Sequence, residues 1–237
     1  MHALEIRDIV RYKNFFNEYQ PLWDLEKNSI FAYEAFIRSK QALNPVTLFQ
    51  EARNNRCLYE LDTSSISNAI SEFPVTCLNE HFLFLNIFPS TIIHPDFPIF
   101  IKRLLNNYPS IKNRVVFEIN EDSNEEPYWT LDMFSLRLKF LKAKGFKIAF
   151  DDFVLTDLSL KKITEYSPNY IKLDRSFSDG LPNSTEKQNK IHSLLAKMKK
   201  EMKLVLEGIE KEEELQAAKN LGIPLLQGYY ISRPKRL

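Results

Sequence analysis

Acidic and amide side chains stand at the ends of a series of short apolar runs along this chain. They are Glu34, Asn86, Glu118, Asp151, Asp152, Asp174, Glu207, Glu210 and Gln227, with the lysine Lys172 among them. If the runs are strands whose ends meet, many carboxylates crowd together, and they stay ionised only with cations bound between them. Oxygen-only ligands favour a hard divalent ion, Mg²⁺ or Mn²⁺, with Ca²⁺ as a non-catalytic competitor.

The adjacent pair Asp151 and Asp152 indicates two ions rather than one. Neighbouring residues at a strand end project differently, so one carboxylate could bridge two metals while the other binds only one. Two metals clamp the attacking and leaving oxygens of a phosphoryl displacement and activate a water. The inferred chemistry is phosphodiester hydrolysis. Taken singly, each acid is more often a helix cap or a solvated loop charge, but that explanation fits the whole set poorly.

The elements that position these residues alternate along the chain. The apolar runs are Ile30 to Tyr33, Phe82 to Leu85, Val115 to Phe117, Lys147 to Phe150, Tyr170-Ile171, Leu204 to Leu206 and Leu225-Leu226. Most of them are rich in β-branched and aromatic residues, as strands are. Helical spacing lies between them, and three of the predicted helices are Leu131 to Lys144, Ile191 to Met202 and Glu212 to Leu221.

Alternating strands and helices predict a mainly parallel sheet, either an open doubly wound sheet or a closed (β/α)₈ barrel. We expect the barrel, for two reasons. The 237 residues approach the ~250 typical of that fold, and nearly every predicted strand ends in a polar residue, whereas an open sheet needs them at one crevice only. No linker divides the chain, so the expectation is one domain over residues 1–237.

Composition excludes several other classes. The formal net charge of +1 gives no field to hold a long nucleic acid, and two cysteines favour a reducing compartment, the cytoplasm. No apolar stretch predicts a signal peptide or a membrane span. The five glycines are too dispersed for a phosphate-binding loop, and the four histidines lack zinc-ligand spacing.

These motifs, in this order, resemble the EAL family of bacterial cyclic di-GMP phosphodiesterases from about residue 20 to 234. The signature is Glu34-Ala35-Phe36 with Arg38 following, preceded by Gln20-Pro21. The other matching segments are Asn86, Glu118-Ile119-Asn120-Glu121, Asp151-Asp152-Phe153, Lys172-Leu173-Asp174, Glu207-Gly208-Ile209-Glu210, Gln227-Gly228-Tyr229 and Ser232-Arg233-Pro234.

The resemblance implies a barrel whose first strand is antiparallel to the rest, and it implies a role for each motif. Glu34, Asn86, Glu118 and Asp151 would bind one metal, and Asp151 with Asp152 the second. Glu207 would act as general base, with Lys172 and the metal ligand Glu34 beside it in the catalytic set. Substrate contacts would come from Gln20, Arg38, Asp174, Gln227 and Pro234, and supporting contacts from Glu121 and Glu210. The resemblance also allows a homodimer of this chain, like that of the family.

One loop departs from the family pattern. The family carries Gly-Thr-Gly after its paired aspartates, and this chain has Val154-Leu155-Thr156 followed by Asp157. Without glycines the loop must take another path. Phe36 also replaces a leucine and adds bulk near the substrate.

The sequence therefore leaves three candidate functions. The first and favoured one is a metal-dependent phosphodiesterase that opens cyclic di-GMP to linear pGpG, because the metal, base and lysine positions are all filled. The second is a receptor that binds cyclic di-GMP without efficient turnover, suggested by the altered loop. The third is a protein-interaction scaffold that has lost the nucleotide. No sensor or cyclase segment is evident in the sequence, so regulation is expected to come from elsewhere.

Overall fold

The strands close into a barrel in the computed structural model, which describes residues 3–120 and 124–237. In order around the barrel they are β1 (Phe15–Asp24), β2 (Ser29–Ser39), β3 (Phe82–Ile87), β4 (Val115–Asn120), β5 (Lys147–Phe153), β6 (Tyr170–Leu173), β7 (Lys203–Leu206) and β8 (Leu225–Leu226). β1 runs antiparallel to both of its neighbours, β2 and β8, and the other pairs are parallel. The expected barrel with an antiparallel first strand is confirmed.

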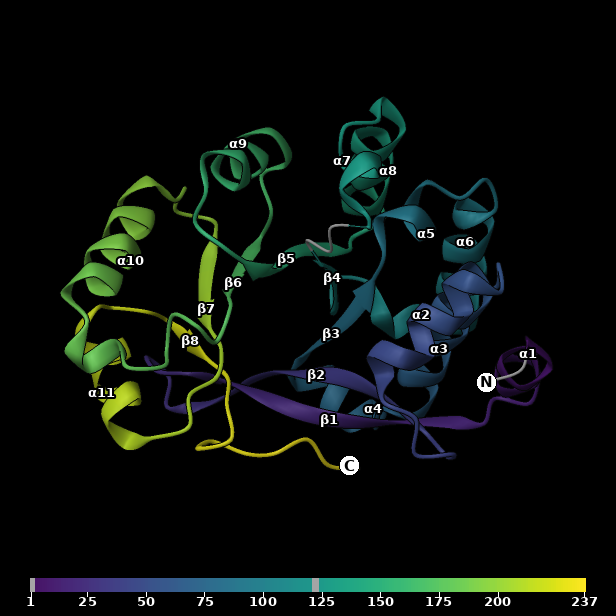
Figure 1. Cartoon of the computed structure of the whole chain (residues 1–237), viewed down its shortest axis with the longest axis horizontal. Coiled ribbons are helices and arrows are strands. Elements are labelled where there is room, and N and C mark those ends of the chain that lie inside the picture. The colour runs from purple at the N-terminus through teal and green to yellow at the C-terminus, as the bar shows by residue number, and fades with distance from the viewer. Residues whose placement is uncertain (1–2, 121–123) are drawn as a thin grey trace.

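Helices surround the strands (Figure 1). Those of the described residues are α1 (Ala3–Arg11), α2 (Pro45–Asn54), α3 (Leu58–Glu72), α4 (Val75–Glu80), α5 (Pro89–Ile93), α6 (Phe97–Asn107), α7 (Glu126–Trp129), α8 (Asp132–Ala143), α9 (Asp157–Tyr166), α10 (Thr185–Lys197) and α11 (Glu212–Asn220). Two short 3₁₀ turns, η1 (Pro109–Ile111) and η2 (Leu181–Asn183), lie in the connections. Figure 1 places α1 at one side of the molecule, near α2 and α3.

Two expectations about the elements need correction. The helix expected over 191–202 is α10, which spans Thr185–Lys197, because Ser184 caps its first turn by accepting a hydrogen bond from the backbone N–H of Lys187. The strands also do not all stop at their polar residue. β2 continues past Glu34 to Ser39, held by ten paired positions along β1.

Apolar packing fills both sides of the barrel wall. Outside it, aromatic and aliphatic side chains pack between strands and helices, and Trp129, Phe134 and Phe150 lie fully buried there. Inside it, one apolar layer crosses the barrel and separates the two mouths, made of Leu22, Ala32, Phe84, Val116, Ala149, Tyr170, Val205 and Leu225. Polar side chains above this layer therefore share one water-accessible mouth.

The altered loop after β5 runs directly into a helix. Thr156 is the N-cap of α9, and its side chain accepts the backbone N–H of Ser159. Val154, in place of a family glycine, is half exposed. The loop thus supplies a helix cap where the family pattern supplies glycines.

None of the described helices is long and apolar enough to span a membrane. Cys57 and Cys77 are both free thiols.

Candidate active site

A single buried lysine lies at the centre of the acidic mouth. Lys172, on β6, is fully buried, and its Nζ lies 2.7 Å from a carboxylate oxygen of Glu118 and of Glu207, 2.8 Å from Glu34 and 3.0 Å from Asp151. The four acids come from β2, β4, β5 and the end of β7. Alternation along each strand directs them inward, above the apolar layer.

This cluster holds more negative charge than the lysine can balance. Burial and the Glu34 carboxylate hold the pKa of Glu118 well above its usual range. Burial likewise raises the pKa of Glu207 well above its usual range and that of Asp151 to about 6, against the attraction of Lys172. The pKa of Lys172 is itself well above normal, because the four carboxylates outweigh the cost of its burial. Among the four acids around Lys172, Glu34 alone has a lowered pKa, since Lys172 and hydrogen bonds overcome its desolvation.

The same cluster leaves buried oxygens without hydrogen-bond donors. An ammonium group has three protons, and here it faces four carboxylates. Both carboxylate oxygens of Glu118 and Oδ1 of Asp151 are buried without a hydrogen-bond partner. Lys172 forms ion pairs with two of these oxygens, at 2.7 Å with Oε1 of Glu118 and 3.0 Å with Oδ1 of Asp151, so one ammonium serves more carboxylate oxygens than it has protons. Unpartnered anionic oxygens are the donor set that a hard divalent cation takes, so the residues fit such an ion.

A distortion of β5 adds a further carboxylate. The pairing of β5 with β6 shifts between Phe150 and Phe153, and Asp152 adopts a left-handed backbone with φ of 51°. As a result Asp151, Asp152 and Glu207 each place an oxygen within 4.8 Å of the others. Asn120 fixes Asp152 by donating from Nδ2 to its Oδ2 at 2.7 Å. Aspartate tolerates this backbone better than most residues, which suits it to such a bulge.

Two amides orient Glu34, and a third holds one of them. Asn86 donates to Oε1 at 3.1 Å and Gln227 donates to Oε2 at 2.8 Å, the oxygen that Lys172 also contacts. Gln227 also donates to Oε1 of Gln20, at 3.1 Å. The amide of Gln20 in turn donates to the carbonyl of Ser232, at 2.9 Å. Glu34 is thereby held in one position at the mouth.

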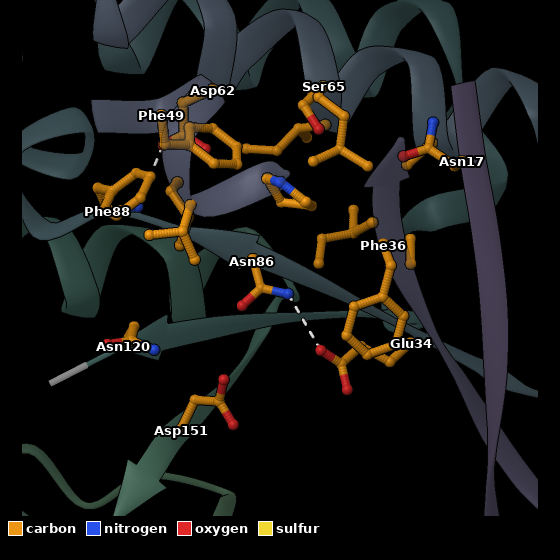
Figure 2. A pocket seen from close by; sticks show the side chains of 18 of the residues that line it. Asn17, Glu34, Phe36, Phe49, Asp62, Ser65, Asn86, Phe88, Asn120 and Asp151 are labelled. Atoms are coloured by element: carbon orange, nitrogen blue, oxygen red, sulfur yellow. Dashed lines mark hydrogen bonds between the residues drawn. The ribbon is translucent and has the colours of Figure 1, made fainter. Parts of the chain in front are cut away.

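A cavity of about 410 Å³ opens beside these acids, between β2, β3, α2 and α3. Its wall includes Phe36, Phe49 and Phe88, with the buried Asp62 farther in. Figure 2 shows the aromatic and polar groups of α2, α3 and the Phe88 segment facing Glu34, Asn86 and Asp151 across the cavity. A planar apolar group with a polar edge would fit such a wall.

A second cavity of about 290 Å³ also borders Phe36. It is lined by Asp174, Arg175 and Tyr229, among others. Phe36, Asp152 and Glu207 line both cavities. The two cavities therefore adjoin at Asp152 and Glu207, and an extended ligand could occupy both with its middle at these acids.

The remaining predicted residues are placed as follows. Arg38 lines the larger cavity and pairs with Glu18 at 2.8 Å. Asp174 and Glu210 line the smaller one, where Asp174 accepts the backbone N–H of Ser176. Pro234 lines neither cavity and lies in the C-terminal segment whose residue Lys235 pairs with β1. Glu121 lies outside the described residues.

Several side chains of the larger cavity were not predicted from the sequence. Phe49 and Arg53 lie on α2, and Asp62 and Ser65 on α3, all at the cavity wall. A polar residue inside a helical pattern, such as Asp62, carries no strand-end signal. Its near-complete burial is the feature that marks it, and burial requires the structure.

The family model for the EAL domain matches residues 3–234. The chain belongs to the EAL domain family. Among curated proteins it is 24% identical over 242 residues to a probable cyclic di-GMP phosphodiesterase, PdeN of Escherichia coli K12, covering 97% of this chain and 45% of that protein. The chain therefore spans less than half the length of this relative.

Solved structures of EAL proteins share the fold. Klebsiella pneumoniae BlrP1, in complex with calcium and cyclic di-GMP, superposes with a TM-score of 0.82 at 29% identity, over 94% of this chain and 56% of that one. BlrP1 was also solved with manganese and cyclic di-GMP. The EAL domain of Xanthomonas citri FimX, in complex with the same dinucleotide, superposes with a TM-score of 0.87 at 19% identity, over 99% of this chain and 94% of that one.

Proposed function

We propose that this protein hydrolyses cyclic di-GMP to linear pGpG with divalent metal ions, Mg²⁺ or Mn²⁺, bound at the acidic mouth. The observation that carries the proposal is the cluster around Lys172, where four carboxylates face one lysine and buried oxygens lack donors. Family membership and the names of the relatives supply the substrate.

The donor set suggests how two ions would be shared. Glu34, Asn86, Glu118 and Asp151 would hold one, and Asp151 with Asp152 the other, while Asp152 and Glu207 approach Asp151 closely. Bound there, the ions would lower the pKa of a water and stabilise charge on the phosphate.

Protein residues supply the remaining chemistry. Glu207 lines both cavities and is the acid placed to accept a proton from the attacking water. Lys172 contacts Glu207 and keeps a positive charge at the point where the phosphate gains negative charge. Arg38 lines the larger cavity and can offer its planar fork to a phosphate after exchanging its pairing with Glu18.

The two cavities fit a dinucleotide. Cyclic di-GMP carries two bases flanking its phosphodiesters, and the two cavities share Phe36, Asp152 and Glu207. One base would enter the aromatic cavity of Phe49 and Phe88, and the other would lie near Asp174 and Tyr229. A scissile phosphate would then lie at the acids.

The test is hydrolysis of cyclic di-GMP by the purified protein with Mg²⁺ or Mn²⁺, with the product resolved by chromatography. We expect linear pGpG from the wild type and a loss of on the order of 100-fold or more in Glu207→Gln. Glu201→Gln, an exposed acid outside both cavities, is the matched control and should retain activity. Wild-type binding without product would contradict the proposal and indicate a receptor.

A further inference from the structure

The opposite mouth of the barrel carries a cluster of cations that the proposed reaction does not use. Arg114 precedes β4, Lys147 begins β5 and Lys203 begins β7. Two residues further along each strand are Val116, Ala149 and Val205, which belong to the apolar layer inside the barrel. Because alternate residues share a face, the three cations belong to the inner face of the wall at its N-terminal rim.

The three cations gather around one pair of aromatic rings. The Arg114 guanidinium lies 5.8 Å and the Lys147 ammonium 5.6 Å from the ring centre of Phe82. The Lys203 ammonium lies 5.1 Å from the ring centre of Phe31, and the two rings are 5.2 Å apart. All five side chains are half-buried. The faces of the rings attract the charged groups but carry no formal charge to neutralise them. Each cation therefore keeps its positive charge for an anion.

No carboxylate of the described chain pairs with any of the three cations. The ion pairs recorded among residues 3–120 and 124–237 all involve other basic groups. β1 also ends at this rim, with Asp24, but Oδ1 of Asp24 accepts the backbone N–H groups of Glu26 and Lys27. Within the part of the chain that the structure describes, the rim thus has three cations without an acidic partner, each packed against an aromatic ring.

We propose that the N-terminal mouth of the barrel, at Arg114, Lys147 and Lys203, is a binding site for a compact, multiply charged phosphate anion. Three cations at the starts of separate strands, all against one pair of neighbouring rings, match a group with two or more negative charges, whereas a carboxylate carries one. The Arg114 fork can take two phosphate oxygens, and the lysines add point charges. The faces of Phe31 and Phe82 are already covered by these cations, so phosphate recognition rather than base stacking is expected.

The apolar layer separates this mouth from the acidic one. Phe84, Val116 and Tyr170 are buried inside the barrel between the two ends. Without bound metal, the excess of carboxylates at the acidic mouth repels an anion, so in metal-free buffer the basic mouth is the end of the barrel expected to bind it. The site can be examined without any assay of phosphodiester hydrolysis.

The test is isothermal titration of inorganic pyrophosphate into the intact protein in metal-free buffer at low ionic strength. We expect binding to the wild type and a rise in Kd of at least about tenfold in the double variant Lys147→Gln with Lys203→Gln. The single variant Arg114→Gln should also weaken pyrophosphate binding, independently of the two lysines. Lys144→Gln is the matched control, because Lys144 is an exposed cation that lies against another ring, 5.8 Å from the ring centre of Phe140 on α8, and the Kd of this variant should stay at the wild-type value.

Three results would overturn the proposal. One is no pyrophosphate binding to the wild type at millimolar concentration. Another is unchanged binding in the double variant while thermal unfolding shows that variant to be folded. The third is tighter binding of hexaglutamate than of pyrophosphate, which would make the mouth a surface for acidic polypeptide instead.

Discussion

Lys172 is the residue on which the acidic mouth depends. It supplies the positive charge that four carboxylates share in the described structure, and its side chain is fully buried. Removing it leaves buried charges unpaired, which is strongly destabilising in proteins. Bound divalent ions would replace part of that charge.

The variant Lys172→Met should therefore be impaired in two ways. We expect kcat for cyclic di-GMP to fall on the order of 100-fold or more, since charge on the phosphate loses a stabilising cation. We also expect its unfolding temperature without metal to lie well below the wild-type value and to recover in part with Mn²⁺. Calorimetry with and without Mn²⁺ measures this, with the exposed Lys190→Met as control. Equal destabilisation in both conditions would argue against charge compensation.

Asp62 gives a pH dependence separate from the metal site. Burial, aided by Glu125, raises its pKa to about 7, although the backbone N–H of Phe88 donates to it. The folded protein therefore binds this proton more tightly than the unfolded chain does, and stability falls as pH rises between about 4 and 7. The variant Asp62→Asn has no proton to lose.

We accordingly expect the unfolding free energy of Asp62→Asn, relative to wild type, to increase from pH 4 to pH 8 by up to a few kcal/mol. Denaturant unfolding at several pH values checks it. Acids that do not interact with Asp62 titrate alike in both proteins and cancel in the difference. A difference that stays constant across this range would contradict the assigned burial of an ionisable group.

At the scale of elements, the turn after β7 positions Glu207. Gly208 has φ of +70°, and a Cβ there would collide with the Cβ of Arg175. The glycine thus permits both the left-handed turn and the close approach of the segment after β6. Gly222, with φ of +75°, has the same backbone preference but open space around it.

Comparison of Gly208 with Gly222 separates the cost of a strained backbone from the cost of a steric collision. Gly222→Ala should cost about 1 to 2 kcal/mol from the left-handed backbone alone. Gly208→Ala should cost more and should also lower kcat, because Glu207 shifts with the turn. Chemical denaturation and the hydrolysis assay measure both effects. Equal costs in the two variants, with activity retained, would show that the approach of Arg175 does not position Glu207.

The barrel and most of its strands could be predicted from the sequence, because the inner and outer faces of a buried parallel strand are both apolar and read as continuous runs. β1 lacks that signal. Its sequence from Phe15 to Asp24 mixes Asn17, Glu18 and Gln20 with apolar residues, and its antiparallel direction was expected from the family resemblance alone. The walls of the larger cavity come from α2 and α3, whose inward residues show only helical spacing.

At the scale of the whole molecule, α1 closes a second apolar cluster outside the barrel. Ile6 and Ile9 are fully buried against Phe15, Leu48 and Leu61, which belong to β1, α2 and α3. The helices that wall the larger cavity are thereby braced from behind. Their stability depends on a segment distant from the acids.

We expect Ile9→Ala to lower the unfolding free energy by about 2 to 5 kcal/mol through cavity formation. Activity per folded molecule should change less than in any variant of the acidic mouth, because Ile9 contacts neither acids nor cavity. Urea unfolding and kinetics on the same preparation give both numbers. An Ile9→Ala variant with the unfolding free energy of the wild type would show that the packing of α1 does not stabilise the fold.

The most direct test of the central claim is turnover of cyclic di-GMP by protein stripped of metal with EDTA, measured as Mn²⁺ is added back. The account predicts no linear pGpG before addition and a rise in rate that saturates with Mn²⁺. The same titration of Asp151→Asn should stay flat, since Asp151 is the carboxylate proposed to serve both ions. Full turnover in EDTA, or bound cyclic di-GMP left intact at saturating Mn²⁺, would contradict it.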